Sequence, residues 1–388
     1  MQAPAQEGLR VAINAHLLSG QDSYRSAGVH QYILHLLRHL GRFDGEEMCF
    51  TALLSADAPE PTSDLTLLRS RWHTSSPAVR VLWEQLVQPR VLRQIEANLA
   101  HGPVFVGPLV TRCPFITTIH DLSFIRFPHL FRPINRHYLT LMTRLSAHRA
   151  RRLIAVSEHA ASEAVLLLGI SRTKIDVVYH GVDPQFHPLP TEEVEAFRER
   201  RGLPERYILF VGTLEPRKNL EHLIEAFSRV YDGRIQLVLV GGAGWLYDDL
   251  YRKVEKLNLG TAVLFPGYVR SEELPLWYNA ATVLAYPSLY EGFGMPVTEA
   301  QACGTPVLTS KASSLPEAAG EAALLVDPHN IDEISAGLNR VLGDLTLQKD
   351  LRERGLAHAQ RFSWSRTAQQ TIQVYRRALD RDAGGEPS

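Results

Sequence analysis

The ten residues YEGFGMPVTE at positions 290–299 decide the fold class of this chain. They follow an apolar run at 283–286 that predicts a strand, and Pro296 suits the first turn of a helix. Gly292 and Gly294 leave the backbone free to turn its N–H groups toward an anion. A strand that runs through a glycine turn into a helix predicts the ligand-binding edge of a parallel α/β sheet.

Strand-like runs alternate with helical patterns along the 388 residues. The predicted strands are 9–15, 48–54, 115–119 and 153–156 in the first half, and 207–212, 235–241, 262–265, 283–286, 306–309 and 323–326 in the second. The clearest helical patterns of the first half are 28–40, 134–149 and 158–168. Because single cores stop growing at about 250–300 residues, this alternation predicts two doubly wound, Rossmann-like α/β domains that face a central cleft.

The segment 180–204 separates the two sets of strands. We interpret it as an inter-domain linker, because four prolines argue against a long helix or a central strand there: Pro184, Pro188, Pro190 and Pro204. The predicted domains are therefore 1–185 and 186–362. In the remainder, 363–388, a helical pattern either caps the second domain or crosses back to the first, and the tail after it is expected to fray.

Composition narrows the class of protein. A formal net charge of −1 gives no sign of a nucleic-acid binder, and 45% hydrophobic residues are ordinary for a globular chain. Cys49, Cys113 and Cys303 lie far apart and match no metal-ligand spacing, which is typical of a reducing compartment. The start of the chain does not resemble a signal peptide, and no apolar stretch approaches about 20 residues. We expect a cytoplasmic protein whose membrane contact, if any, is peripheral.

Two cations follow the strand at 207–212. Arg217 and Lys218 precede a helical pattern that starts at Leu220, so they suit a diphosphate that also meets the helix N-terminus. A solvated pair on a turn is the alternative.

The glycine run at 241–244, which includes Gly242, closes another strand, but Tyr247 stands where the last glycine of GxGxxG belongs. A phosphate or sugar contact and a tight turn both stay open there.

Glu291 and Glu299 flank the glycine turn. Glu299 lies about one helical turn inside the predicted helix, so both carboxylates are able to accept hydrogen bonds from hydroxyls of one ligand. A carboxylate near a helix N-terminus is stabilised there in any case, which is the alternative for Glu299. That alternative leaves Glu291 and the two glycines unexplained, so a binding function is favoured.

Several segments together are typical of one family. They are EGFGMPVTEAQACGTPV at 291–307, VGTLEPRKNL at 211–220, HGVD at 180–183, PGYV at 266–269 and SLPEAAGEAALLVDP at 314–328. They resemble glycosyltransferase family 4, whose members share the GT-B fold, and the resemblance covers nearly the whole chain. Thr213 departs from the pattern, because many relatives have an arginine there.

The resemblance implies a donor site. Arg217 and Lys218 would hold the diphosphate of a nucleotide sugar, Glu291 the transferred sugar, and Glu299 the ribose. The other expected donor-binding residues are Gly292, Phe293, Gly294 and Met295, Tyr268 and Val269 beside the base, and Gly242.

The first domain supplies a histidine. His120 and Asp121 follow the strand at 115–119, but neighbours on a strand end point in opposite directions, so a hydrogen bond between them is not expected. The segment TTIHDLSF at 117–124 resembles one that places a histidine near the transferred sugar. The resemblance thus implies that His120 and Glu291 act at the reaction centre. Gly28 is the expected acceptor or phosphate loop residue, with a tight turn as its alternative.

The implied reaction is front-face hexose transfer with retention of configuration. The expected donor is GDP-mannose first and UDP-glucose next, and the acceptor is a glycan or a lipid-linked glycan of polysaccharide assembly. We expect no cofactor and no metal, since the Asp-x-Asp triplet at 380–382 lies in the tail.

Two segments of the first domain suggest an acceptor or membrane surface. The interval 122–157 has no acidic residue and seven arginines, so it either docks on anionic lipid or pairs with acids elsewhere: Arg126, Arg132, Arg136, Arg144, Arg149, Arg151 and Arg152. The segment RVLWEQ at 80–85 resembles acceptor-domain sequence of family mannosyltransferases, with plain core packing of Trp83 as the alternative.

Two other classes of function compete with this prediction. A dinucleotide-dependent oxidoreductase also has paired α/β domains, but the glycine fingerprint is incomplete and no convincing acid follows it by about 20 residues. A non-catalytic protein that binds sugar nucleotides would keep the same pocket, and only turnover excludes it.

Overall fold

The computed structural model describes residues 8–18, 28–45, 47–62, 64–74, 76–242 and 247–380. These residues form two compact units. The first contains residues up to Gly181 together with the C-terminal segment from Trp364, and the second contains Val182–Ser363. Several sequence expectations fall outside the described part, including Gly244 and Asp382.

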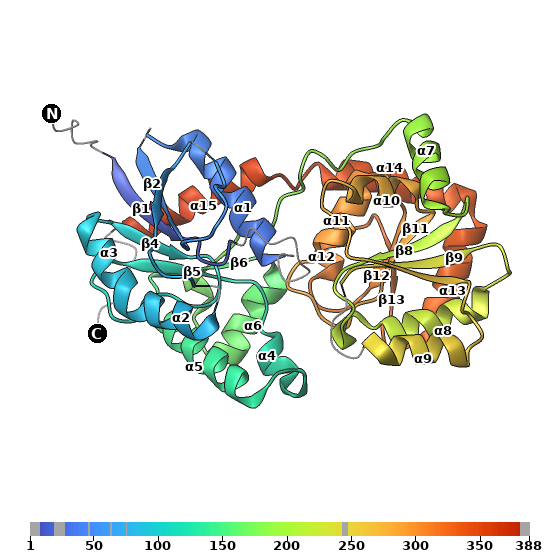
Figure 1. Cartoon of the computed structure of the whole chain (residues 1–388), viewed down its shortest axis with the longest axis horizontal. Coiled ribbons are helices and arrows are strands. Elements are labelled where there is room, and N and C mark those ends of the chain that lie inside the picture. Colours follow the sequence, from blue (N-terminus) through green and yellow to red (C-terminus); the bar gives the residue numbers. More distant parts are fainter. Residues whose placement is uncertain are drawn as a thin grey trace. The chain divides into compact units, whose positions relative to one another are not determined.

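Unit 1 is built on a seven-stranded parallel sheet (Figure 1). Its strand order is β3 (Thr66–Arg69), β2 (Met48–Leu54), β1 (Leu9–Asn14), β4 (Leu99–Gly102), β5 (Phe115–Ile119), β6 (Arg152–Ala155) and β7 (Ile175–Val177). The order reverses between β1 and β4, so the crevice where ligands bind in doubly wound sheets lies at their carboxyl ends.

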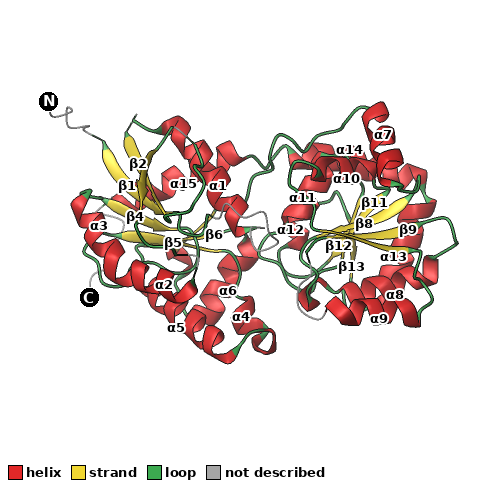
Figure 2. Cartoon of the chain, in the orientation of Figure 1, coloured by secondary structure: helices red, strands yellow, loops and turns green. Residues whose placement is uncertain are grey.

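Unit 2 repeats the plan with six parallel strands (Figure 2). The order is β10 (Val263–Gly267), β9 (Gln236–Val240), β8 (Tyr207–Val211), β11 (Val283–Tyr286), β12 (Val307–Ser310) and β13 (Leu324–Val326). Every residue of β8 and β11 is buried, as expected for central strands covered on both faces by helices. Here the order reverses between β8 and β11.

Helices fill the connections of each sheet. In unit 1 they are α1 (Val29–Leu40), α2 (Pro77–Leu82), α3 (Gln88–Gln94), α4 (Ser123–Arg126), α5 (Pro133–Arg149), α6 (Glu158–Leu168) and α15 (Trp364–Leu379). In unit 2 they are α7 (Thr191–Arg201), α8 (Leu220–Val230), α9 (Tyr247–Lys256), α10 (Leu274–Ala280), α11 (Met295–Ala302), α12 (Leu315–Ala319), α13 (Ile331–Gly343) and α14 (Leu345–Ala359).

The C-terminal helix α15 belongs to unit 1. It packs beside α1, and its Tyr375 hydroxyl lies 2.8 Å from His101 Nδ1 in the strand β4. Arg151 donates to the carbonyl of Ala378 at 3.0 Å, and Thr367 donates to the carbonyl of Tyr179 at 2.8 Å. These bonds attach the last helix to a unit whose sheet strands all come from the first half of the chain.

The interpretation of 180–204 as a linker without a long helix is wrong in part. The prolines occupy only the two ends of the segment, and the helix α7 forms between Pro190 and Pro204. Glu192 and Glu193 lie in its first turn and three arginines in its last, which complements the helix dipole, and Gly202 ends it in a left-handed conformation.

Candidate functional site

The charged residues singled out in unit 2 gather where its strand order reverses. Val283 and Leu284 of β11 pair with Ile208 and Leu209 of β8, so the loops that leave these two strands start side by side. Arg217 and Lys218 lie on a short 3₁₀ turn after β8, and Glu291 follows β11. The position is the one at which doubly wound sheets bind ligands.

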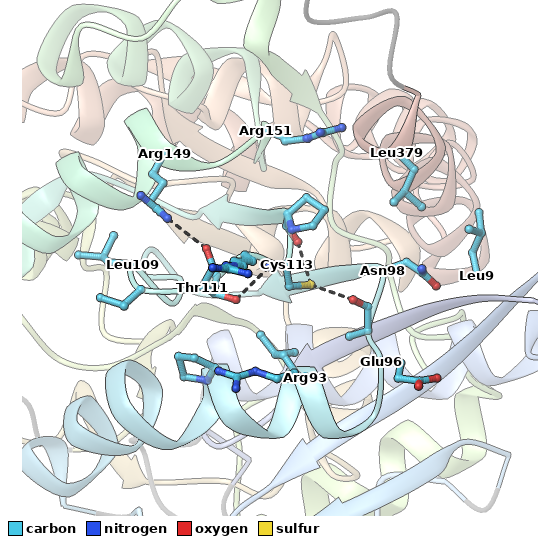
Figure 3. Close-up of a pocket in the computed structure, with 16 residues that line it drawn as sticks. Leu9, Arg93, Glu96, Asn98, Leu109, Thr111, Cys113, Arg149, Arg151 and Leu379 are labelled. Atoms are coloured by element: carbon cyan, nitrogen blue, oxygen red, sulfur yellow. Dashed lines mark hydrogen bonds between the residues drawn. The ribbon is translucent and has the colours of Figure 1, made fainter.

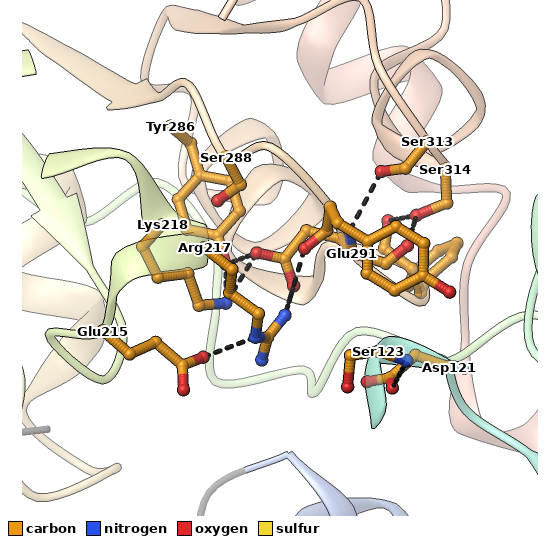
Figure 4. A network of polar contacts seen from close by, with 12 residues as sticks. Asp121, Ser123, Glu215, Arg217, Lys218, Tyr286, Ser288, Glu291, Ser313 and Ser314 are labelled. Atoms are coloured by element: carbon orange, nitrogen blue, oxygen red, sulfur yellow. Dashed lines mark hydrogen bonds and ion pairs between the residues drawn. The ribbon is translucent and has the colours of Figure 1, made fainter. Parts of the chain in front are cut away.

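Lys218 and Glu291 form a buried ion pair (Figure 4). Lys218 Nζ lies 2.6 Å from Glu291 Oε1 and donates a second bond, 2.8 Å long, to the Tyr286 hydroxyl. That hydroxyl donates in turn to Glu291 Oε1 at 2.9 Å. Three side chains thus close a ring of hydrogen bonds, which fixes the positions of both charges.

Arg217 completes the network from the outer side. Its Nη1 lies 3.0 Å from Glu291 Oε2 and 3.1 Å from the carbonyl oxygen of Tyr290, while its Nε lies 2.5 Å from Glu215 Oε1. The four charges sum to zero. Glu291 therefore has a cation on each oxygen, and Arg217 is shared between two acids.

Burial and charge act in opposite directions on these groups. Burial alone would raise the pKa of Glu291, but Lys218 and Arg217 outweigh it and lower the pKa to about 2. Burial lowers the pKa of Lys218, with the charge of Arg217 acting in the same direction and Glu291 acting against it. Glu291 is thus a carboxylate near neutral pH, and its lone pairs are directed at cations.

The turn at 290–294 is held by serines that follow β12. Ser313 Oγ accepts the backbone N–H of Glu291 at 2.9 Å, and Ser314 donates to the carbonyls of Glu291 and Phe293. Gly294 has φ +103°, and a side chain there would place its Cβ 2.6 Å from Leu315 Cδ2. Only glycine fits this turn without strain. Gly292 is partly exposed, whereas Phe293 is buried against Phe362.

The helix α11 begins at Met295 and carries Glu299 in its second turn. The Tyr278 hydroxyl donates to Glu299 Oε2 at 2.8 Å. Burial raises the pKa of Glu299 to about 7, with the charge of Asp183 in the same direction and the Tyr278 hydrogen bond against it. The side chain is only partly exposed, and Oε1 has no protein partner among the described residues.

The glycines after β8 and β9 bring two backbones together. A Cβ on Gly241 would lie 1.9 Å from the carbonyl oxygen of Gly212, and the Gly242 carbonyl accepts the Leu214 N–H at 3.1 Å. This geometry supports the tight-turn interpretation of Gly241. Beyond β10, at the same edge of the sheet, Tyr268 is exposed and Val269 is partly exposed.

His120 lies in unit 1, at the carboxyl end of β5. Its Nε2 donates to the Pro103 carbonyl at 2.8 Å, and its ring packs edge-on against Tyr32. Burial lowers its pKa, so the ring is neutral with the lone pair on Nδ1. Asp121 instead accepts the Ser123 N–H at 2.9 Å, consistent with the expectation that the neighbours do not bond.

Gly28 is the residue before α1 and has φ +55°. A Cβ there would meet nothing within 4 Å among the described residues, so the backbone conformation and not crowding favours glycine.

Five of the seven arginines of 122–157 fall into two groups by their bonding partners. Arg126 forms a bidentate pair with Glu163, and Arg152 pairs with Asp176, as the structural alternative predicts. Arg144, Arg149 and Arg151 donate to backbone carbonyls while staying exposed.

Sequence reasoning missed four polar contributors to the site. They are Tyr278, Tyr286, Ser313 and Asn219. Asn219 connects its own loop after β8 to the loops after β11 and β13, because its side chain donates to the Pro287 and Pro328 carbonyls. The tyrosines resemble ordinary core aromatics in the sequence. Ser313 and Asn219 have φ of +52° and +62°, and a polar residue at a strand-to-helix turn was the available signal.

A cavity of about 1230 Å³ lies elsewhere, at the amino ends of the unit 1 strands (Figure 3). Its lining includes Leu9, Arg93, Val110, Arg149 and Leu379. Its lining contains none of the residues expected at the donor site or the reaction centre, although Arg149 and Arg151 belong to the arginine-rich interval 122–157.

Two features are absent from the described residues. No group of three or more His, Cys, Asp or Glu side chains in this part of the chain is arranged to hold a metal ion. No described helix combines the length and the apolar composition needed to cross a bilayer.

Two family descriptions cover most of the chain between them. Residues 26–186 match Glycosyltransferase Family 4, and residues 192–358 match Glycosyl transferases group 1. The O-antigen chain mannosyltransferase B of Escherichia coli is 34% identical over 75% of this chain and 78% of its own. A D-inositol 3-phosphate glycosyltransferase of Streptomyces bingchenggensis is 35% identical over 59% of this chain and 53% of its own.

Solved structures share the fold at low identity. Sucrose-phosphate synthase from Thermosynechococcus elongatus superposes with a TM-score of 0.77 at 21% identity, over 95% of this chain and 98% of that one. Anabaena HepE, in complex with UDP and glucose, superposes with a TM-score of 0.74 at 20% identity, over 95% and 99%.

Proposed function

The chain belongs to glycosyltransferase family 4, and on that premise we propose that it moves a hexose from a nucleotide-diphosphate sugar to a glycan or lipid-linked acceptor with retention of configuration. In this reaction the bond from the anomeric carbon to the diphosphate oxygen breaks, and a bond to an acceptor hydroxyl oxygen forms on the same face. The hydroxyl proton moves to the departing phosphate oxygen. The two Rossmann-like sheets are those of a GT-B glycosyltransferase.

The paired cations around Glu291 carry the proposal. Arg217 and Lys218 stand at the reversal point of the unit 2 sheet, next to the glycine turn and the start of α11. The diphosphate gains negative charge as the bond to the sugar breaks, and fixed cations stabilise that charge without reorganising. In this proposal they replace a divalent metal, and the backbone N–H groups of Gly292, Gly294 and Met295 assist them.

Glu291 is proposed to bind sugar hydroxyls and not to attack the anomeric carbon. Both of its oxygens already accept bonds from cations, and its lowered pKa marks a weakly basic carboxylate. An ionised, fixed acceptor of this kind orients a hydroxyl well. We therefore propose front-face transfer without a covalent bond between the sugar and Glu291.

The remaining roles follow the geometry of each group. Glu299 Oε1 is proposed to accept ribose hydroxyls, while Tyr268 and Val269 flank the base. In unit 1, His120 offers the Nδ1 lone pair to a hydroxyl of the transferred sugar, and Gly28 lies in the acceptor or phosphate loop.

Mannose is the favoured sugar and GDP the favoured nucleotide. Support comes from the 34% identity to a mannosyltransferase over three quarters of the chain. UDP-glucose is the second choice, since the Anabaena neighbour holds UDP and glucose.

A thermal-shift panel of GDP-mannose, UDP-glucose, ADP-glucose and NAD tests the donor. A true donor at 100 times its dissociation constant should stabilise the protein by about 2.7 kcal/mol. Lys218→Met should abolish that shift, whereas Lys311→Met, at an exposed lysine of the same unit, should keep it. Stabilisation by NAD alone would refute the proposal. The anomeric configuration of the product, read by NMR, tests retention.

We also propose that unit 1 contacts anionic membrane at the cytoplasmic face through α5. Ile134, Leu141 and Leu145 are exposed along this helix at spacings of seven and four residues, which places them on one side, and arginines accompany them. Co-sedimentation with vesicles containing anionic lipid at low salt tests this. Leu141→Ser should weaken binding and Leu345→Ser, at an exposed leucine of unit 2, should not. If the wild type does not bind these vesicles, the proposed membrane contact is refuted.

A further inference from the structure

In the helix segment after α2 the apolar side chains are exposed and a charged side chain is buried, the reverse of the usual arrangement. Leu82 and Leu86 are 50% and 55% exposed, whereas Glu84 between them is only 9% exposed. The backbone turns here as a π-helix over Trp83–Val87, so both Trp83 and Glu84 point inward. Short π-helical turns are rare and are frequent at functional sites.

Glu84 is poorly compensated for its burial. Asn14, the last residue of β1, donates its Nδ2 to Glu84 Oε1 at 3.2 Å, and Arg80 Nε approaches the same oxygen only to 3.9 Å. Oε2 has no hydrogen-bond partner in the described part of the chain. Burial outweighs Arg80 and Asn14 and raises the pKa of Glu84 to about 7. An apolar or amide side chain would suit a purely structural position better.

His16 provides a second unsatisfied group beside it. The ring stacks on Trp83 with 3.7 Å between centroids, and Nδ1 lies 2.8 Å from Thr74 Oγ1. The side chain is 3% exposed, and among the described residues Nε2 has no partner. Asn14 Oδ1 accepts the His16 backbone N–H at 3.1 Å, so one amide holds both His16 and Glu84.

The cluster of Asn14, His16, Trp83 and Glu84 lies where the unit 1 sheet reverses its order, just beyond β1. We propose that it is the hydroxyl-binding subsite for the acceptor sugar, in which Glu84 Oε2 and His16 Nε2 each bond one ring hydroxyl. This inference rests on the proposed glycosyl transfer and assigns its specificity on the acceptor side to unit 1.

A sugar ring fits these two groups better than a charged ligand. Burial, with Arg80 in the same direction, lowers the pKa of His16 to about 4, so the imidazole is neutral and bonds a hydroxyl in either tautomer. Glu84 accepts a hydrogen bond from a hydroxyl in either protonation state, and its ionised form repels phosphate. Neighbouring hydroxyls of a pyranose, each both donor and acceptor, satisfy both atoms, whereas an empty subsite leaves the buried His16 Nε2 without a partner among the described residues.

The test measures binding of methyl α-mannoside, methyl α-glucoside and methyl β-galactoside by saturation-transfer NMR. At roughly 50 mM, above the millimolar affinity expected of one ring, at least one should bind the wild type. Glu84→Gln keeps the volume and removes the anion, and should raise the dissociation constant about tenfold or more. Glu96→Gln, at an exposed carboxylate after α3, is the matched control and should bind as the wild type does.

Two results would overturn the subsite. One is unchanged glycoside binding by Glu84→Gln, and the other is no glycoside binding by the wild type. A thermal-unfolding curve with and without GDP-mannose, recorded on the same samples, shows whether each variant is folded. If glycosides bind in a Glu84-dependent way but no nucleotide sugar binds, the proposed transfer fails while the subsite stands. If a nucleotide sugar binds but no glycoside does, the subsite fails while the proposed transfer stands.

Steady-state kinetics distinguish a binding role of Glu84 from a merely structural one, because only a binding role changes the KM of the acceptor selectively. Once the acceptor is identified, Glu84→Gln should raise its KM about tenfold with little change in the KM of the donor. An equal loss in both would mean that Glu84 only supports the fold.

Discussion

Lys218 Nζ lies 2.6 Å from Glu291 Oε1, although 72 residues separate the two in the chain and only the pairing of β8 with β11 brings them together. Both side chains are buried, and the Tyr286 hydroxyl bonds each of them. The pair is thus at once the centre of the proposed donor site and part of the core of unit 2.

The pair should show strong energetic coupling. Lys218→Met leaves a buried carboxylate with Arg217 alone, and Glu291→Gln leaves a buried ammonium, so each should destabilise the protein by about 3–5 kcal/mol. The double variant should be more stable than the sum predicts, with a coupling of about 1–3 kcal/mol in urea unfolding. Simple additivity would mean that the ion pair does not persist in solution.

Glu84 should make stability depend on pH. Its folded pKa of about 7 exceeds the ordinary value of 4.5, so the folded state binds the extra proton and stability falls as pH rises from about 4.5 to 7. The fall is up to about 3 kcal/mol for a full shift, and Glu84→Gln should remove it. His16 acts in the opposite direction, because its folded pKa of about 4 lies below the ordinary 6.5 and its contribution to stability rises with pH between these values. The Glu84 contribution is therefore the difference between the wild type and Glu84→Gln, and Tyr138, with a pKa of about 12, titrates outside this window.

Urea unfolding at several pH values between 5 and 8 provides the measurement. Part of the slope should remain in Glu84→Gln, since the pKa of Glu299 is raised in the same direction. Glu96→Gln should retain the full slope. Identical slopes for the wild type and Glu84→Gln would contradict the raised pKa of Glu84.

Gly241→Ala should be severely destabilising. The new Cβ would meet the Gly212 carbonyl oxygen at 1.9 Å with φ at +154°, so the loops after β8 and β9 would have to separate. We expect a loss of more than about 2 kcal/mol. Gly260→Ala, with open space and no positive φ, should change stability by less than about 0.5 kcal/mol. Equal effects at both positions would refute the close approach.

Tyr375→Phe tests the attachment of α15. The variant leaves His101 Nδ1 without its partner inside the sheet, which should cost about 1–3 kcal/mol in thermal or urea unfolding. Tyr231→Phe, at an exposed tyrosine of unit 2, serves as the control and should be nearly neutral. A neutral Tyr375→Phe would show that the helix is held by apolar packing alone.

The sequence was informative where one local pattern carries the whole signal. The strands Met48–Leu54, Phe115–Ile119 and Val283–Tyr286 were predicted to the residue, because each is a compact apolar run between turn signals. β4 was missed, since Leu99–Gly102 is short and contains His101 and a glycine. Its burial comes from neighbouring strands and from α15, which no local pattern reveals.

The candidate site was likewise predicted only in part from the sequence. The residue types and the strand ends were sufficient to select Arg217, Lys218 and Glu291, which the structure brings together. Their mutual pairing was not predicted, because it depends on β8 and β11 being neighbours. Glu84 was quoted only as part of a family-like segment. Its inward direction depends on a π-turn, which ordinary helical spacing conceals.

The return of α15 to unit 1 has a consequence for synthesis on the ribosome. Unit 2, Val182–Ser363, is continuous and has all its strands once residue 363 has emerged. Unit 1 is translated first, yet its sheet lacks the Tyr375 partner of His101 until the last helix follows. Domains usually fold in the order in which they emerge. In this chain the first unit to appear should be the last to complete its fold, because the apolar surface of α1 stays exposed until α15 packs against it.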